Sequence, residues 1–328
     1  MKAIIYTKYG PPEILQLKEI EKPVPKDNEV LVKVIAASVN PADWHMIRGE
    51  PKFARLTFGL TKPKNIIPGI DLAGQVESVG RDVKEFHPGD EVFGACGWGG
   101  AFAEYVCGTE KSLVHKPANI TFEEAAAIFV AAISALQGLR DKGKIQSGQK
   151  VLINGASGGV GTFAVLLAKH FGAEVTGVCS TRNLDLVRSI GADNAIDYTK
   201  EDFTNTTQKY DLIIDNIANR LVTDLKRALN PNGLCVIIGF SSLSRMFQYM
   251  FLGPLVSMAG NKKIASLGTA KPNKKDLLLL KDLLESGKIK PVIDRRYPLS
   301  QVSEAIRYLE EGHARGKVVI NIGNSSNL

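Results

Sequence analysis

The sequence predicts an α/β protein with two domains, a barrel-like domain of β-strands and a doubly wound domain built on a parallel sheet. Its 328 residues exceed the size at which a single hydrophobic core keeps growing. Short strands and turns fill residues 1 to about 117, whereas short aliphatic strands alternate with helical segments from residue 150 to about 268. That alternation is typical of parallel strands, which need helical crossovers and are buried on both faces.

The strands of the first part show period-two patterning. Val30, Val32 and Val34 alternate with residues of different character, which favours half-buried strands. At Thr121 the pattern changes to that of a helix, with Thr121 as the N-cap and Glu124 completing a capping box. We expect this helical stretch to bridge the two domains.

The C-terminal part is predicted to return to the first domain. Helical patterns cover residues 276–286 and 302–311, and the strand KVVINI follows them. We therefore predict a first domain over residues 1–122 that is completed by about 272–328, and a second domain over residues 123–271.

Charge and cysteine content argue against several classes of protein. The net charge is +7, but Lys and Arg are spread along the chain without a basic block, so a small anionic cofactor explains the charge better than a nucleic-acid partner. The four cysteines form no Cys-x-x-Cys pair, which argues against a disulfide framework and a thiolate metal site. We expect reduced thiols in a cytoplasmic protein.

Hydropathy favours a protein without a membrane span. The N-terminal residues lack a signal-peptide pattern, and no apolar run reaches the roughly 18 residues that a span requires. The most apolar segment covers residues 246–259 and is interrupted by Gly253 and Pro254. We interpret it as a helix pair at a subunit contact or over the substrate cleft, with peripheral membrane attachment as the alternative.

The strongest motif is a glycine-rich turn in KVLINGASGGVGTFAVLLAKHF. A strand runs into Gly155, Gly158, Gly159 and Gly161 and then into an amphipathic helix. Glycines at such a turn let backbone amides approach a pyrophosphate, whose charge lies at the helix N-terminus. The position between a strand and a helix predicts a dinucleotide site; the alternative is a turn that only permits helix–sheet packing.

The end of the next strand predicts which dinucleotide binds. Ser180, nineteen residues after Gly161, stands there with Thr181 and Arg182, and none of the three is a carboxylate that would bind the ribose hydroxyl of NAD. Hydroxyls and a guanidinium suit a phosphate ester, so the pattern favours NADPH. The alternative for Arg182 is a solvated residue in the next helix. Tyr198 can flank the adenosine or serve in packing alone.

With these motifs in view, the chain resembles the medium-chain dehydrogenases/reductases, and in particular their quinone oxidoreductase (zeta-crystallin-like) branch. The resemblance covers essentially the whole chain. It implies a GroES-like β-barrel catalytic domain and a Rossmann nucleotide-binding domain. The motifs that carry it are NPAD (40–43), PGIDLAGQVESVG (68–80), PGDEVFG (88–94), GAFAEY (100–105), GASGGVG (155–161) and GKVVI (316–320).

The same resemblance implies chemistry without zinc. Asn40, Ile70 and Val130 stand at the positions where the zinc-dependent relatives carry a cysteine, a histidine and a cysteine, and none is a usual zinc ligand. The stretch that matches their structural zinc lobe offers only Cys96 and Cys107. Oxidising a simple alcohol needs a Lewis acid for the developing alkoxide, whereas a quinone or an enone needs only hydrogen-bond donors.

The resemblance also assigns roles to individual residues. Asn40 and Asp43 are expected beside the nicotinamide, and His45 stands where many quinone reductases of this branch carry a tyrosine. His45 can hydrogen-bond or protonate the substrate oxygen, or it can be a partly buried histidine bonded to the backbone. Lys317 can reach the cofactor or cap the final strand. The complete set of expected cofactor contacts is Ser134, Ser157, Gly158, Gly159, Val160, Ser180, Thr181, Arg182, Tyr198, Gly239, Phe240 and Lys317.

The sequence thus predicts an NADPH-dependent, zinc-independent reductase of quinones or of α,β-unsaturated carbonyl compounds. We expect a homodimer formed through the sheets of the nucleotide domains. Two alternatives are an enoyl-thioester reductase and an NADPH-binding protein with little turnover.

Overall fold

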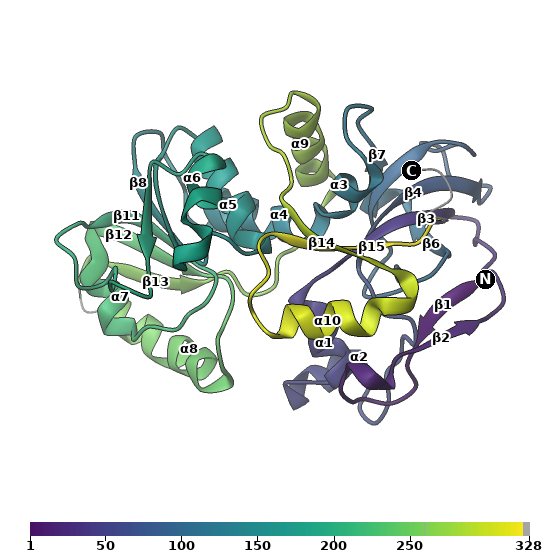
Figure 1. Cartoon of the computed structure of the whole chain (residues 1–328), viewed down its shortest axis with the longest axis horizontal. Helices are drawn as coiled ribbons and strands as arrows, with labels where there is room; N and C mark the ends of the chain where they lie inside the picture. The colour runs from purple at the N-terminus through teal and green to yellow at the C-terminus, as the bar shows by residue number, and fades with distance from the viewer. Residues whose placement is uncertain (259, 324–328) are drawn as a thin grey trace. The chain divides into compact units, whose positions relative to one another are not determined.

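The computed structural model describes residues 1–258 and 260–323, and the chain forms two compact units (Figure 1). The first unit contains Met1–Ala131 and residues 272–323, and the second contains the described residues of Ala132–Lys271. The chain passes into the second unit after Ala131 and not after residue 122, because helix α3 (Phe122–Ala126) packs on strands β3 (Glu29–Val39) and β4 (Asp71–Val79) of the first unit.

The start of α3 shows why the helix begins at that residue. The Glu124 N–H donates to the Thr121 hydroxyl at 3.1 Å, and the Thr121 N–H donates to the Glu124 carboxylate at 2.9 Å. The predicted capping box is confirmed.

The first unit is built on a seven-stranded sheet with the order β14-β15-β3-β4-β5-β7, and β6 pairs with β3. Its pairs are antiparallel except β14 with β15. Val30, Val32 and Val34 of β3 point into the hydrophobic core, as their alternation predicts. The remaining strands are β1 (Lys2–Ile5) and β2 (Gln16–Glu19), which pair with each other, and β5 (Glu91–Ala95), β6 (Tyr105–Thr109), β7 (Leu113–His115), β14 (Ile293–Pro298) and β15 (Lys317–Asn321).

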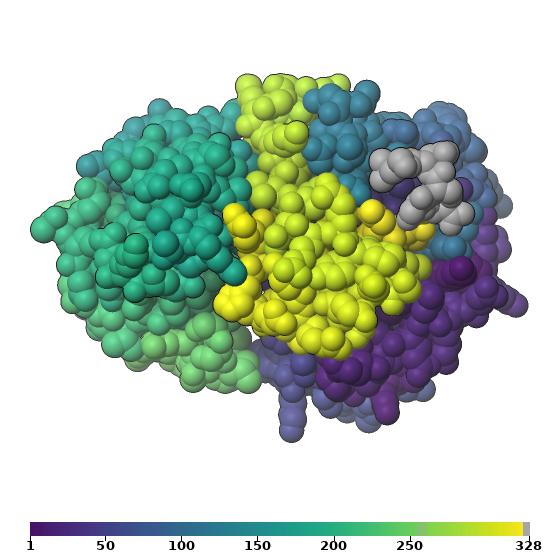
Figure 2. Space-filling view, viewed as in Figure 1, coloured from purple at the N-terminus to yellow at the C-terminus, as the bar shows by residue number. Residues whose placement is uncertain are grey.

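Helices close the barrel of the first unit and tie its two chain segments together. Helix α1 (Pro41–Arg48) contacts α10 (Val302–Glu310). Arg48 donates two hydrogen bonds to the Glu310 carboxylate, from Nε to Oε1 at 2.6 Å and from Nη2 to Oε2 at 3.0 Å. Figure 2 shows the C-terminal residues, in yellow, lying against the purple N-terminal residues of this unit. The other helices are α2 (Arg55–Phe58), α9 (Lys274–Glu285) and the 3-10 turns η1 (Pro12–Ile14), η2 (Lys52–Ala54), η3 (Glu110–Ser112) and η6 (Leu299–Gln301).

The second unit is built on a six-stranded parallel sheet with the order β10-β9-β8-β11-β12-β13. This is the doubly wound Rossmann order, in which the chain leaves the first strand, β8, in opposite directions. Ligands of such sheets bind beyond the carboxyl ends of the strands at that switch point. The strands are β8 (Lys150–Asn154), β9 (Glu174–Cys179), β10 (Asn194–Asp197), β11 (Tyr210–Asp215), β12 (Leu229–Ile237) and β13 (Lys263–Ser266).

The helices of the second unit precede this sheet or connect its strands. They are α4 (Phe129–Leu136, which begins in the first unit), the π-helix η4 (Gln137–Lys142), α5 (Gly159–His170), η5 (Thr181–Asn183), α6 (Leu184–Ser189), α7 (Val222–Ala228) and α8 (Leu243–Met258). Within the described residues, no helix has both the length and the apolar character needed to cross a bilayer. The predicted fold class, a GroES-like barrel with a Rossmann domain, is confirmed.

Candidate functional site

The glycine-rich turn joins β8 to α5 and contains two kinds of glycine. A Cβ at Gly161 would lie 2.0 Å from the Gly155 carbonyl oxygen, so the fold itself requires glycine there. Gly158 is the N-cap of α5 with φ −82°, and its nearest neighbour for an added Cβ is 3.6 Å away. The fold therefore does not require glycine at 158, and the space that a side chain would fill lies at the helix N-terminus, where the sequence analysis expects a pyrophosphate.

One side chain that the sequence analysis missed connects this turn to the end of β9. The Nδ2 of Asn183 donates to the hydroxyls of Ser157 at 3.0 Å and Ser180 at 3.3 Å, and Asn183 is 5% exposed. Asn183 therefore links the glycine-rich turn to the residues that are expected at the 2′-phosphate. Its only sequence signal is its place three residues after Ser180.

The residues expected at the 2′-phosphate lie together. Ser180 follows β9, and Thr181 and Arg182 form the first residues of η5. The Tyr198 N–H donates to the Cys179 carbonyl at 3.0 Å, so Tyr198 lies beside the end of β9, and its side chain is half exposed.

A carboxylate from the neighbouring strand also reaches this place. The Thr181 hydroxyl donates to Asp197 Oδ2 at 2.5 Å, and the Thr199 hydroxyl donates to Oδ1 at 2.7 Å. These hydrogen bonds hold the pKa of Asp197 below its usual range. Lys200 lies 3.8 Å from the same carboxylate and offsets its charge. Sequence reasoning named Tyr198 after the neighbouring strand β10 but missed both Asp197 and Lys200 on either side of it.

Ser134, Gly239 and Phe240 occupy different places in the second unit. Ser134 lies on α4 and is buried, whereas Gly239 and Phe240 follow β12. A Cβ at Gly239 would lie 2.3 Å from the Asn216 carbonyl oxygen, so glycine there is needed for packing of the strand ends. Phe240 packs against the core of this unit.

Asp215 is the last residue of β11, and its carboxylate accepts hydrogen bonds from the surrounding loop. Its Oδ1 accepts hydrogen bonds from Asn154 Nδ2 at 2.8 Å and from the backbone N–H groups of Ile217 and Ala218. Burial raises the pKa of this carboxyl. The group organises the loop after β11.

The first unit contains a buried ion pair between Lys317 and Asp71. The Lys317 Nζ lies 3.3 Å from Asp71 Oδ2 and donates to Asn40 Oδ1 at 2.5 Å, and the three side chains are at most 3% exposed. Asp71 also accepts hydrogen bonds from the Ser38 hydroxyl at 2.8 Å and from the Val130 N–H at 3.1 Å. This cluster, which we name the Lys317 cluster, brings together β3, β4, β15 and the start of α4.

The Lys317 cluster lies among the three positions that the resemblance matches to zinc ligands. Asn40 binds the ammonium directly, Ile70 precedes Asp71, and the backbone of Val130 binds the Asp71 carboxylate. The positive charge at this place is therefore supplied by a side chain of the protein. Sequence reasoning expected Lys317 to reach the cofactor or to cap the final strand and did not pair it with Asp71.

The ammonium also orients the amide of Asn40. A lysine can only donate, so it must face the amide oxygen, and the Nδ2 of Asn40 points the other way. The Nδ2 contacts the Ser38 carbonyl at a long 3.4 Å. Asn40 therefore presents a hydrogen-bond donor in a fixed direction.

Asp43 supports Asn40 from inside α1. Its Oδ2 accepts the Asn40 N–H at 2.7 Å, which fixes the backbone of Asn40 at the start of the helix. Asp43 is fully buried, and burial raises its pKa to about 7, although the Asn40 N–H opposes that rise. The contact that the structure shows for Asp43 is with the backbone of Asn40.

His45 is held in one tautomer by the backbone. Its Nδ1 lies 3.0 Å from the Glu50 carbonyl oxygen, which can only accept, so Nδ1 carries the proton and Nε2 of the neutral ring carries a lone pair. The ring stacks on Trp44 with centroids 3.6 Å apart. Burial lowers the pKa of His45. At neutral pH His45 can accept a hydrogen bond at Nε2, and the backbone-bonded alternative is the one that the contacts favour.

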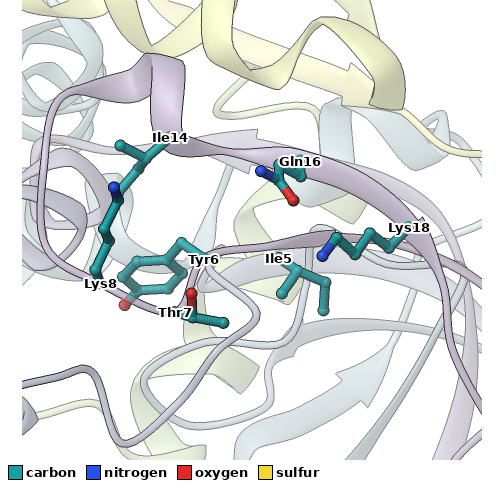
Figure 3. A pocket seen from close by; sticks show the side chains of 7 residues that line it. All are labelled: Ile5, Tyr6, Thr7, Lys8, Ile14, Gln16 and Lys18. Carbon is teal, nitrogen blue, oxygen red and sulfur yellow. The ribbon is translucent and has the colours of Figure 1, made fainter.

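A pocket in the first unit is lined by none of the side chains of the Lys317 cluster (Figure 3). Its volume is about 60 Å³, far below the several hundred Å³ of typical ligand pockets. It is too small for a quinone. Its lining residues are Ile5, Tyr6, Thr7, Lys8, Ile14, Gln16 and Lys18.

The cysteines do not form a metal site in the part of the chain that the structure describes. No three His, Cys, Asp or Glu side chains among the described residues gather in an arrangement that could hold a metal ion. Burial raises the pKa of Cys96 and that of Cys107, the latter to about 11, so both are thiols at neutral pH.

The glycine turn on a Rossmann sheet and the Lys317 cluster in a GroES-like barrel define the class of medium-chain dehydrogenases/reductases. Two family descriptions match the chain. Residues 26–118 match "Alcohol dehydrogenase GroES-like domain", and residues 190–320 match "Zinc-binding dehydrogenase". The second match begins after positions 40, 70 and 130, so its description does not bear on those residues.

Similarity to known proteins identifies the family within this class. The chain is 36% identical to 2-methylene-furan-3-one reductase of Solanum lycopersicum and to the chloroplastic NADPH-dependent alkenal/one oxidoreductase of Arabidopsis thaliana, covering 98% of this chain and 79% of each relative. The solved quinone oxidoreductase from Coxiella burnetii superimposes with a TM-score of 0.87 at 30% identity, over 98% of this chain and 99% of that one. The chain belongs to the zinc-independent quinone oxidoreductase family of the medium-chain dehydrogenases/reductases.

Proposed function

We propose that the protein reduces quinones or α,β-unsaturated carbonyl compounds with NADPH and without a metal. The observation that carries the proposal is the Lys317 cluster, which places an ammonium and the oriented amide of Asn40 among the positions that match zinc ligands. A conjugated acceptor spreads the negative charge that develops on its oxygen, so hydrogen-bond donors suffice to stabilise it. The named activities of the two plant relatives agree with this substrate class.

Residues of the second unit are proposed to hold the cofactor. The Ser157 hydroxyl and the first-turn amides of Gly158, Gly159 and Val160 suit the pyrophosphate, because Gly158 leaves its side-chain space empty. The other proposed contacts are Ser180, Thr181, Arg182, Lys200 and Tyr198 for the adenosine 2′-phosphate, and Ser134, Gly239 and Phe240 for the nicotinamide half. Bound NADPH supplies the hydride that the substrate accepts.

The residues of the first unit are proposed to bind the substrate oxygen and to orient the donor. Asn40 Nδ2 is the donor, Lys317 and Asp43 hold Asn40 from two sides, and His45 contributes packing and an acceptor at Nε2. Because the pKa of His45 is lowered, solvent is the proposed source of the proton.

A substrate panel tests the proposal. The purified protein should oxidise NADPH with quinones and with enones, and a chelator should leave the rate unchanged, whereas simple alcohols with NADP⁺ should give no turnover. Turnover of a primary alcohol that the chelator abolishes would refute zinc-free chemistry. An enoyl thioester in the same panel tests the alternative of an enoyl-thioester reductase. NADPH binding without turnover of any acceptor would leave only the NADPH-binding alternative.

Two further properties belong to the proposal. We propose a homodimer that pairs edge strands of the nucleotide sheet, such as β13, because β10 and β13 end the sheet order. Light scattering on the purified chain measures the mass, and the mass of one chain would contradict it. We also propose a cytoplasmic protein, which fractionation of the source cells tests.

A further inference from the structure

Helix α8 of the second unit carries an exposed apolar surface, which we name the α8 apolar face. Its side chains are 43% to 83% exposed, although each is large and apolar. Soluble proteins rarely expose contiguous apolar patches of this kind unless the patch binds something. The face consists of Leu243, Phe247, Met250, Phe251, Leu252, Leu255 and Met258.

The helix geometry makes these side chains one surface. Leu243, Phe247, Phe251 and Leu255 follow each other at intervals of four residues, which places them along one side of the helix. The rings of Phe247 and Phe251 lie 6.3 Å apart and nearly parallel, at 14°.

The opposite side of α8 is fixed to the rest of the unit. The buried Tyr249 donates its hydroxyl to the Arg220 carbonyl at 2.6 Å. Near the C-terminal end, the Ile264 N–H donates to the Ser257 hydroxyl at 2.9 Å, which joins α8 to β13. The apolar face therefore points outward because its helix is anchored on the other side.

The chain around the α8 apolar face is basic and free of acids. Residues 225–271 contain six Lys or Arg and no Asp or Glu. Arg245 lies in the first turn of α8, Lys262 and Lys263 follow the helix, and Lys263 is exposed. On the adjacent α7, the carboxylate of Asp224 is paired with Arg227.

We infer that the α8 apolar face docks the protein on a membrane surface that contains anionic lipids. An amphipathic helix of this type lies in the interface, with Phe and Leu side chains among the acyl chains and Lys and Arg at the headgroups. Anionic headgroups supply the negative charge that residues 225–271 lack. This charge complementarity is the reason for choosing an anionic lipid surface as the occupant of the α8 apolar face.

Co-sedimentation with vesicles tests the inference. The full chain should bind vesicles of equal parts phosphatidylcholine and phosphatidylglycerol, and binding to pure phosphatidylcholine should be much weaker. The F247S/F251S variant should lose at least about tenfold in partitioning, because two aromatic side chains no longer enter the interface. The K262Q/K263Q variant should weaken binding to the anionic vesicles, and about 1 M salt should weaken binding of the wild-type chain.

A matched control distinguishes binding through the α8 apolar face from non-specific binding through any exposed apolar side chain. Phe53 and Leu56 are also exposed, at 54% and 74%, but belong to the first unit. The F53S/L56S variant should bind vesicles like the wild type, and all variants should keep the wild-type thermal midpoint. The inference is refuted if the wild-type chain does not bind anionic vesicles, or if F247S/F251S binds these vesicles as well as the wild type does. It is also refuted if F247S/F251S converts a dimer to monomers, since a second copy then covers the face.

Discussion

Replacing Lys317 by methionine removes the cation from the Lys317 cluster while keeping a side chain of similar length. Asp71, 0% exposed, then stays buried without its ion partner. Removing one partner of a buried pair typically costs about 3–5 kcal/mol. Asp71 keeps its hydrogen bonds from Ser38 and Val130, so we expect the lower end, about 3 kcal/mol of unfolding free energy.

The double variant D71N/K317M isolates the cause. It removes the unpaired charge, so its unfolding free energy should recover by about 2 kcal/mol relative to K317M. Urea unfolding followed by circular dichroism measures each variant. As a control, K169M breaks the ion pair of Lys169 with Asp193, whose side chains are 35% and 39% exposed, and should cost less than about 1 kcal/mol.

Activity gives the second readout of the same variants. K317M should lower kcat by at least about tenfold, because Asn40 loses the contact that fixes its amide. The reasoning is wrong if K317M costs no more than K169M, or if the effects of D71N and K317M on stability simply add.

Three more predictions concern the cofactor turn, Arg182 and Asp43. G161A should prevent stable folding because its Cβ would meet the Gly155 carbonyl oxygen. G158A should keep the thermal midpoint of the wild type and weaken NADPH binding at least about tenfold. If the two variants changed the thermal midpoint and NADPH binding equally, the distinction between the two glycines would be wrong. R182A should weaken NADPH binding far more than NADH binding in calorimetry, and equal losses would show that Arg182 does not bind the 2′-phosphate. The pKa of Asp43 is raised from 3.8 to about 7, so ionising this buried carboxyl removes stability as the pH rises through 7. D43N should remove that decline, of order 4 kcal/mol between pH 4 and pH 8 in urea unfolding, and a decline equal to the wild type's would assign it to other groups.

The features that the sequence predicts best are those set by neighbouring residues. The turn between β8 and α5 follows from glycines placed between a strand pattern and a helix pattern, and the capping box at Thr121 follows from two residues three apart. The parallel sheet follows from repeated strand–helix alternation. Each of these signals lies within one short window of sequence, where backbone geometry alone limits the outcome.

The features that the sequence could not predict depend on residues far apart in the chain. Lys317 reaches Asn40 across 277 positions, so nothing local marks the two as partners. Asp197 meets Thr181 only because β9 and β10 pair in the register that the sheet sets. The sequence leaves two interpretations of His45 open because the tautomer of its ring depends on the backbone carbonyl of residue 50. Every residue type has such a carbonyl, so the residue type at position 50 carries no signal.

The position of β15 in the first sheet sets an order of events during synthesis. β15 inserts between β14 and β3, yet it follows the whole second unit in the chain. While the ribosome makes residues 132–271, residues 36–39 of β3, which later pair with β15, have no strand on that side and expose backbone groups. The Rossmann unit, continuous in sequence, is therefore free to fold first, and the barrel closes only after Lys317 has emerged. A nascent chain halted before β15 is thus the species that most needs a chaperone.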